Sequence, residues 1–197
     1  MQAEIILVLG GTRSGKSEFA EHYVLHKGQL GAYIATAEIL DDEMAFRVKL
    51  HRERRIKRWL NFEAPYAAEK VLPEAAKAAD AILFDSLTVY LSNLIYGKDA
   101  LQGSTEEKVP QVREKIEQVL TAARATGKTV VFVANDVGGG IVPANPMARE
   151  FQDLAGWVNQ QVGAAADHVY YVLAGQAVDI KKLAFKFIED ESGKNSN

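Results

Sequence analysis

A glycine-rich segment of eight residues constrains the fold of this chain more than any other feature. It reads Gly-Gly-Thr-Arg-Ser-Gly-Lys-Ser at residues 10–17 and fits G-x-x-x-x-G-K-[ST] at every fixed position. An apolar run precedes the segment and a helical pattern follows it, as in the strand–loop–helix unit that cradles phosphates. Chance would produce the four fixed positions in roughly one chain in a hundred of this length. The segment therefore predicts a P-loop, a phosphate-binding loop at the start of a helix.

The residue types in this loop suit a triphosphate and its metal ion. Glycines let successive backbone N–H groups turn toward phosphate oxygens, and the helix directs its positive end at the same place. Lys16 supplies a positive charge for the β- and γ-phosphates, and the hydroxyl of Ser17 is a ligand for Mg²⁺. We therefore expect the nucleotide to be bound by Gly10, Gly11, Thr12, Arg13, Ser14, Gly15, Lys16 and Ser17.

Short apolar runs alternate with longer helical patterns along the chain. The runs that predict buried strands cover residues 5–9, 32–36, 81–84, 129–134 and 168–173. The helical patterns cover residues 16–26, 41–58, 65–79, 87–96, 105–125 and 146–162, the last of them behind an Asn145 cap. This alternation predicts an α/β fold with a mostly parallel sheet flanked by helices. We expect one catalytic domain over residues 1–188 and a polar, disordered tail over 189–197.

Composition narrows the classes of function. The 197-residue chain is 48% hydrophobic and 25% charged, which is the balance of a globular protein with a core. It contains no cysteine, so disulfides and thiolate chemistry are excluded. The net charge of −3 argues against a nucleic-acid partner. The apolar run at residues 5–9 is too short for a signal sequence or a membrane span, so we expect a cytoplasmic protein.

Polar residues follow several of the predicted strands. Asp85 ends the run at 81–84, and we expect it to hold Mg²⁺ together with Ser17. The alternative is that Asp85 caps the helix at 87–96. Thr36 ends another strand, and Asp136 with three glycines at 138–140 follows a third. Because ligands gather beyond the carboxyl ends of parallel strands, we expect Thr36 and Asp136 to contact nucleotide or substrate. For residues 135–143 the alternative is a flexible turn.

His51 lies in a strongly basic segment. Six of the eleven residues at 49–59 are lysine or arginine, a pattern that on its own indicates a solvated helical face. The functional alternative is a nucleophile in a positive patch, because neutral imidazole is well populated at pH 7. His22 and His26 share one helix face, and no third ligand for a metal ion is evident, so we interpret both as helix-face residues.

Several blocks along the chain together resemble one enzyme family, the bifunctional adenosylcobinamide kinase / adenosylcobinamide-phosphate guanylyltransferases of cobalamin biosynthesis. The blocks lie at residues 6–17, 33–37, 41–44, 47, 51, 59, 85–88, 91–94, 135–143, 148–160, 173–175 and 180–181. The P-loop is shared by very many proteins, whereas the block around His51 and the turn at 137–143 are more particular to this family. Asp136 stands where the family commonly has glutamate, a carboxylate one methylene longer.

This resemblance implies two reactions. A nucleoside triphosphate, ATP or GTP, phosphorylates the aminopropanol hydroxyl of adenosylcobinamide, with Lys16 as a catalytic residue. GTP then donates GMP to the new phosphate through a guanylylated histidine, which aligns with His51. The resemblance also implies a RecA-like core and a homotrimer, and Mg²⁺ is the cofactor expected from Ser17 and Asp85. Two alternatives remain open from the residues alone: another P-loop small-molecule kinase without a covalent intermediate, and a nucleotide switch that catalyses nothing.

Overall fold

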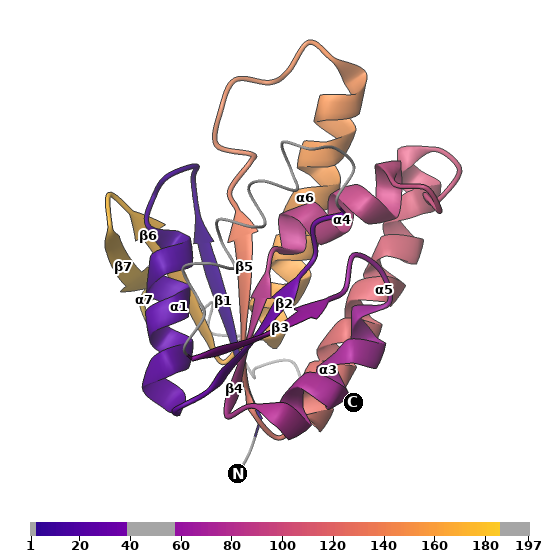
Figure 1. Ribbon diagram of the computed structural model, residues 1–197. Coiled ribbons are helices and arrows are strands. Elements are labelled where there is room, and N and C mark those ends of the chain that lie inside the picture. Colours follow the sequence, from indigo (N-terminus) through magenta and orange to yellow (C-terminus); the bar gives the residue numbers. More distant parts are fainter. Residues whose placement is uncertain (1–2, 39–57, 186–197) are drawn as a thin grey trace, which may run out of the picture.

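The structure is a computed structural model that describes residues 3–38 and 58–185. Its elements in chain order are β1 (Glu4–Gly10), α1 (Lys16–Lys27), β2 (Gly31–Ala35), β3 (Trp59–Glu63), α3 (Ala68–Ala78), β4 (Ala81–Asp85), α4 (Leu87–Tyr96), α5 (Thr105–Ala125), β5 (Thr129–Asn135), α6 (Pro146–Ala165), β6 (His168–Leu173), β7 (Gln176–Asp179) and α7 (Ile180–Leu183). Figure 1 shows the sheet at the centre with helices on both of its faces.

The strands of the described residues form one sheet in the order β3-β2-β4-β5-β1-β6-β7. All neighbours are parallel except β6 and β7, which form an antiparallel hairpin at one edge. The predicted mostly parallel α/β fold is therefore confirmed. Gly10 at the end of β1 pairs with Asn135 at the end of β5, and Asp85 on β4 pairs with Val133. The carboxyl ends of β1, β4 and β5 thus lie side by side. We call this border of the sheet, where the strands end, its carboxyl edge.

The two faces of the sheet are covered by different layers. Ile6 and Val8 of β1 pack with Ala20 and Val24 of α1 on one face. On the other face, the alternate residues of β1 pack beneath the layer formed by α3, α4, α5 and α6. Strands β1, β4 and β5 are consequently buried on both sides, which explains why their sequences are apolar almost without interruption.

Side-chain caps define where three of the helices begin. The Ser86 hydroxyl accepts a hydrogen bond from the Val89 N–H at the start of α4. Ser104 and Glu107 form a reciprocal capping box before α5. The predicted Asn145 cap is confirmed, because its side chain accepts from the Met147 N–H and proline occupies the first position of α6. The predicted bounds at 87–96 and 105–125 match α4 and α5.

The structure differs from the prediction at the two edge strands and at the start of one helix. Strands β3 and β7 were not predicted; both are short and lie at the two edges of the sheet. The helix expected from residue 65 begins at Ala68, because Ala67 has a positive φ of 49° that ends the preceding turn. The helix expected at 41–58 lies outside the described residues except for Arg58, which is in a turn. Across residues 3–38 and 58–185, none of the helices is long and apolar enough to cross a membrane.

Candidate active site

The predicted P-loop connects the buried end of β1 to α1. Its backbone turns through positive φ angles at Arg13 (58°) and Gly15 (95°). A Cβ atom at Gly10 would lie 2.5 Å from the Ser14 Oγ and 2.6 Å from the Val172 carbonyl oxygen, so only glycine fits there. The loop and the first turn of α1 line a cavity of about 290 Å³. This cavity has the lining expected of a phosphate site: Arg13, Ser14, Gly15, Lys16, Ser17 and Glu18.

The Lys16 side chain turns back over the loop. Its Nζ donates a hydrogen bond to the Gly11 carbonyl oxygen at 3.2 Å. Partial burial lowers the pKa of the Lys16 ammonium below its ordinary value, while the negative charge of Asp85 acts in the opposite direction. The negative charge of the β4 carboxylate thus favours the protonated form of Lys16.

The β6–β7 hairpin supports the loop from the other side. The Gly175 N–H donates to the Ser14 carbonyl oxygen at 2.8 Å. A Cβ atom at Gly15 would lie 3.1 Å from the Gly175 Cα, so the two backbones are closely packed. The Ser14 Oγ is buried against Gly10 and has no hydrogen-bond partner among the described residues. The loop is therefore shaped by contacts on both of its sides.

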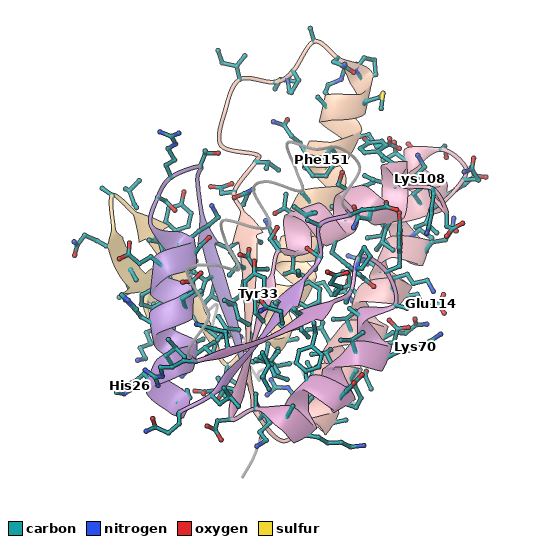
Figure 2. The ribbon with its side chains drawn as sticks, in the orientation of Figure 1. His26, Tyr33, Lys70, Lys108, Glu114 and Phe151 are labelled. Atoms are coloured by element: carbon teal, nitrogen blue, oxygen red, sulfur yellow. The ribbon has the colours of Figure 1, made fainter. Side chains whose placement is uncertain are left out.

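Asp85 is oriented by a tyrosine of the neighbouring strand. The Tyr33 hydroxyl donates a hydrogen bond to the Asp85 Oδ2 at 2.9 Å, and Tyr33 lies near the middle of the molecule in Figure 2. The alternative role of Asp85 as a helix cap is wrong, because Ser86 caps α4. Asp85 is thus held by Tyr33 at the carboxyl end of β4.

The donor atoms at this edge suit Mg²⁺. Ser17 offers a hydroxyl oxygen from the first turn of α1, and Asp85 offers a carboxylate. Magnesium prefers such oxygen ligands and usually takes only one or two from protein, the rest coming from phosphates and water. Among the described residues there is no group of three or more His, Cys, Asp or Glu side chains that could hold a metal ion.

Thr36 occupies a different position from the one expected of a nucleotide ligand. Its side chain is fully buried. The Thr36 hydroxyl donates to the Ser86 carbonyl oxygen and accepts from the Ser86 N–H, at 2.9 and 2.8 Å. In this structure Thr36 is therefore a positioning residue that fixes the segment after Asp85, rather than a group presented to solvent.

Asp136 is exposed beside the loop. Its N–H donates to the Gly10 carbonyl oxygen at 3.1 Å, which ties the end of β5 to the start of the P-loop. Its carboxylate accepts a hydrogen bond from the Tyr171 hydroxyl at 3.0 Å. The carboxylate thus stands at the edge where the P-loop lies, as the sequence predicted for this residue.

The histidines that the structure describes lie in different surroundings. The predicted nucleophile His51 lies outside the described residues. His22 and His26 are exposed on α1, and Figure 2 shows His26 near the end of that helix. His168 begins β6, where its Nδ1 lies 2.7 Å from the Asp179 Oδ2.

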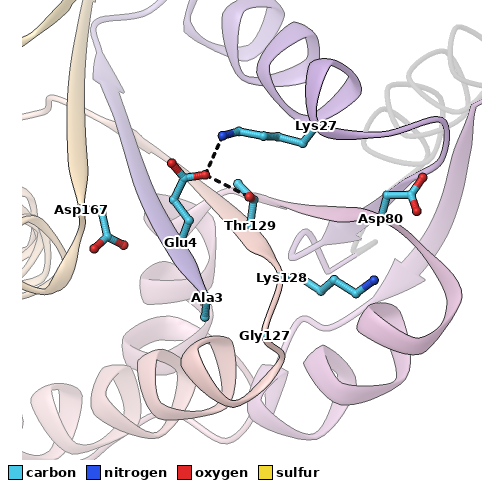
Figure 3. Close-up of a pocket in the computed structure, with 8 residues that line it drawn as sticks. All are labelled: Ala3, Glu4, Lys27, Asp80, Gly127, Lys128, Thr129 and Asp167. Atoms are coloured by element: carbon cyan, nitrogen blue, oxygen red, sulfur yellow. Dashed lines mark hydrogen bonds and ion pairs between the residues drawn. The ribbon is translucent and has the colours of Figure 1, made fainter. Parts of the chain in front are cut away.

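A second cavity, of about 620 Å³, lies at the amino ends of the strands, opposite the P-loop (Figure 3). Its acidic side chains already have partners. Glu4 contacts Lys27 and Thr129, as Figure 3 shows, and Asp167 contacts Arg124. Asp80 accepts from the Gln29 and Leu30 N–H groups. These contacts make the cavity a structural feature of the strand starts.

Three residues of the site were not among the predicted ligands, although Tyr33 and Gly175 lie in blocks that resemble the family. Tyr33, Tyr171 and Gly175 reach their partners only because the sheet places distant strands side by side. A short sequence pattern could have indicated Gly175 alone, because an Ala-Gly pair after an apolar run is typical of a tight turn.

The chain is similar to known proteins over most of its length. The family model for cobinamide kinase / cobinamide phosphate guanyltransferase matches residues 6–180. The bifunctional adenosylcobalamin biosynthesis protein CobU of Escherichia coli K12 is 38% identical over 181 residues, covering 90% of this chain and 99% of that protein. The corresponding protein CobP of Pseudomonas aeruginosa is 34% identical over 175 residues, covering 89% and 96%.

A solved structure is similar in fold. A KaiC-like protein from Pyrococcus horikoshii superposes with a TM-score of 0.50 at 15% sequence identity, covering 86% of this chain and 71% of that one. At this identity the likeness concerns the fold alone. It confirms the predicted P-loop fold with a RecA-like core.

Proposed function

The chain belongs to the cobinamide kinase / cobinamide phosphate guanyltransferase family, and from this premise we propose that one P-loop serves both of its reactions. The protein is a bifunctional transferase, a cobinamide kinase and cobinamide phosphate guanylyltransferase. The observation that carries the proposal is the Lys16 loop, which is built as a phosphate cradle within a chain matching these relatives almost end to end.

In the kinase step, the loop binds the triphosphate of ATP or GTP. Backbone N–H groups of residues 10–17 and the start of α1 surround the phosphates, and Lys16 and Arg13 offset their charge. Ser17 and Asp85 would hold Mg²⁺, which when bound offsets charge on the phosphoryl group in transit. The acceptor oxygen of the aminopropanol side chain bonds to the γ-phosphorus as the bond to the β,γ-bridging oxygen breaks.

In the guanylyl step, His51 is the proposed nucleophile. A neutral imidazole nitrogen bonds to the α-phosphorus of GTP, and the bond to the leaving pyrophosphate breaks. The phosphate oxygen of the first product then bonds to the same phosphorus, and the N–P bond breaks. Two steps replace one difficult displacement. The segment that carries His51 follows the carboxyl end of β2, the sheet edge where the P-loop lies.

The proposed partners follow from the same premise. The acceptor is the corrinoid adenosylcobinamide, whose product is adenosylcobinamide-GDP, and the donors are nucleoside triphosphates. We propose a homotrimer as the assembly, a state that light scattering coupled to size-exclusion chromatography measures directly. A mass corresponding to one chain, of 21.6 kDa, would exclude it.

The experiment that tests the histidine uses GTP labelled at the α-phosphate. The purified protein is incubated with labelled GTP and Mg²⁺, denatured, and examined for bound label. The expected adduct is labile in acid and stable in alkali, as a phosphorus–nitrogen bond to imidazole is. His51→Ala should lose the label and keep kinase activity. His26→Ala, an exposed histidine on α1, is the matched control and should label like the wild type.

Two outcomes would contradict the proposal in different ways. Label retained in His51→Ala would place the nucleophile elsewhere. No label in a wild type that binds GTP would exclude the covalent route and leave a P-loop kinase or a nucleotide switch. Turnover of the corrinoid acceptor separates these last two.

A further inference from the structure

A carboxylate at the P-loop edge is held from two strands away. Asp136 follows β5 and Tyr171 lies on β6, yet the Tyr171 hydroxyl donates to the Asp136 Oδ2 at 3.0 Å. Strand β1 lies between β5 and β6, and Leu9 of β1 pairs with Tyr171. The hydrogen bond therefore passes over the carboxyl end of β1, where the P-loop begins. The Asp136 N–H, bonded to the Gly10 carbonyl, fixes the same residue from its backbone.

The charge of Asp136 decides what it can do there. A carboxylate repels the phosphate oxygens that the loop binds, so a direct contact with the triphosphate is unfavourable. The metal role is already suited to Asp85, which stands on β4 and is oriented by Tyr33. A carboxylate that remains beside a phosphoryl donor is well suited to take a proton from the attacking alcohol.

The β5–α6 connection leaves room beside Asp136 for the alcohol that accepts the phosphoryl group. Asp136 is exposed, and residues 138–140 beyond it are exposed glycines. A Cβ atom at Gly139 would lie 3.6 Å from the Asp136 Oδ2, and one at Gly138 or Gly140 would meet nothing within 4 Å. Beyond these glycines, the Arg149 side chain donates to the Pro143 and Ala144 carbonyl oxygens and anchors the returning chain.

We propose that Asp136 is the proton acceptor of the kinase step and that Tyr171 is its positioning residue. This inference rests on the proposed function. The alcohol oxygen of the acceptor bonds to the γ-phosphorus, its proton passes to the Asp136 carboxylate, and the electron pair of the breaking P–O bond leaves with the nucleoside diphosphate. The proton then passes from Asp136 to solvent, so the carboxylate is restored for the next turnover.

Tyr171 is suited to hold this group without competing for the proton. A hydroxyl donates one hydrogen bond to one carboxylate oxygen, so the other oxygen can face the alcohol. The hydrogen bond to the Asp136 carboxylate raises the pKa of Tyr171 above its ordinary value of 10.0, and the tyrosine stays protonated at neutral pH. Because a short carboxylate has little reach, fixing its direction matters more here than for a glutamate.

Only one of the two reactions needs the proposed proton acceptor. Phosphorylation must remove a proton from an alcohol. Guanylyl transfer uses a phosphate acceptor, which has already lost its proton at neutral pH. A change confined to the proton acceptor should therefore impair the kinase and spare the GMP adduct.

The test compares four variants with the wild type in both assays. Asp136→Asn keeps the shape and removes the base, so kinase kcat should fall on the order of 10²- to 10⁴-fold. The KM for ATP and the labelling by GTP should be unchanged. Asp136→Glu keeps a base and should retain more activity than Asp136→Asn. Tyr171→Phe should lower kinase kcat about tenfold, again without raising the KM for ATP.

Tyr170→Phe is the matched control. Tyr170 is the neighbouring residue on β6 but packs against Phe19 and Tyr23 on the face that α1 covers. It should leave kinase kcat near the wild-type value. Circular dichroism checks that each variant folds, and Tyr171→Phe still tests the idea if Asp136→Asn does not fold.

Three results would overturn the inference. Wild-type kinase kcat in Asp136→Asn would exclude a proton acceptor at this position. A loss that excess Mg²⁺ restores would make Asp136 a metal ligand, and a loss seen only as a raised KM for ATP would make it a nucleotide contact. A wild type that shows neither kinase nor adduct would instead contradict the proposed function itself.

Discussion

The ammonium group of Lys16 lies 3.2 Å from the carbonyl oxygen of Gly11, an oxygen of the loop that Lys16 itself ends. The contact holds the lysine over the loop, in the environment of Asp85. A phosphate entering the loop offers the ammonium a charged acceptor in place of a neutral carbonyl, and hydrogen bonds between charged groups are roughly twice as strong. The lysine is therefore poised to exchange one partner for a better one.

Removal of this side chain should damage both activities. We expect Lys16→Ala to lower the rates of phosphorylation and of GMP adduct formation on the order of 10²-fold or more, because both steps need the same triphosphate site. Lys70→Ala, on the exposed surface of α3, is the control for loss of one lysine (Figure 2). Steady-state rates and labelling with GTP measure the two effects. A variant impaired in one activity alone would show that the two triphosphates bind at separate places.

The two glycines that open the loop should differ in their tolerance of a side chain. Gly10→Ala would drive a methyl group into the Ser14 Oγ and the Val172 carbonyl, and we expect it to cost about 1 to 3 kcal/mol of unfolding free energy. A Cβ atom at Gly11 meets nothing within 4 Å, so Gly11→Ala should unfold like the wild type without nucleotide. Urea denaturation of both variants measures the difference. Equal stability would mean that the loop relaxes around the added methyl group.

A buried asparagine joins two loops near this edge. The Asn93 Nδ2 donates to the Thr36 carbonyl at 2.7 Å and to the Pro65 carbonyl at 3.0 Å. Asn93→Ala leaves both oxygens without this donor, and we expect a loss of about 2 to 3 kcal/mol in unfolding free energy. Asn61→Ala, exposed on β3, should cost far less. Denaturant unfolding of the Asn93→Ala and Asn61→Ala variants measures this difference in stability. Similar midpoints would show that water replaces the Asn93 amide.

The central strands could be predicted because a strand that is buried on both faces has an almost continuously apolar sequence. Strands β3 and β7 could not, since an edge strand needs an apolar side chain on one face only. Trp59–Glu63 has one buried residue, Trp59, followed by alternating partly buried and exposed positions, and Gln176–Asp179 has no fully buried residue. For so short a strand, partners from elsewhere in the chain decide the structure.

The candidate site, like the sheet, could be predicted only in part. The loop and Asp85 follow from a contiguous motif and from the end of an apolar run. Thr36 stood at the right edge, but whether its hydroxyl faces solvent or Ser86 depends on how β2 and β4 pair. The Tyr171–Asp136 contact depends on the strand order, because it joins residues that are neither adjacent in sequence nor on paired strands.

The stability of the protein in acid should depend on Glu150. This carboxylate of α6 accepts a hydrogen bond from the Lys108 ammonium of α5 at 3.0 Å, and both side chains are largely buried (Lys108 is labelled in Figure 2). The hydrogen bond from Lys108 lowers the pKa of Glu150 below its ordinary value of 4.5. A carboxyl group whose pKa is depressed by folding stabilises the protein above its unfolded pKa. That contribution is lost as the pH falls through the lower, folded value.

Glu150→Gln should therefore be less stable than the wild type at pH 7 by about 1 to 2 kcal/mol. The difference in unfolding free energy should shrink as the pH falls below about 4.5, because the wild type then loses the same charge. Glu114→Gln, exposed on α5, controls for removing one negative charge elsewhere (Figure 2). Urea melts from pH 7 to pH 3 give the two curves. A difference that stays constant over this range would mean that Glu150 stabilises the α5–α6 contact by packing rather than by its charge.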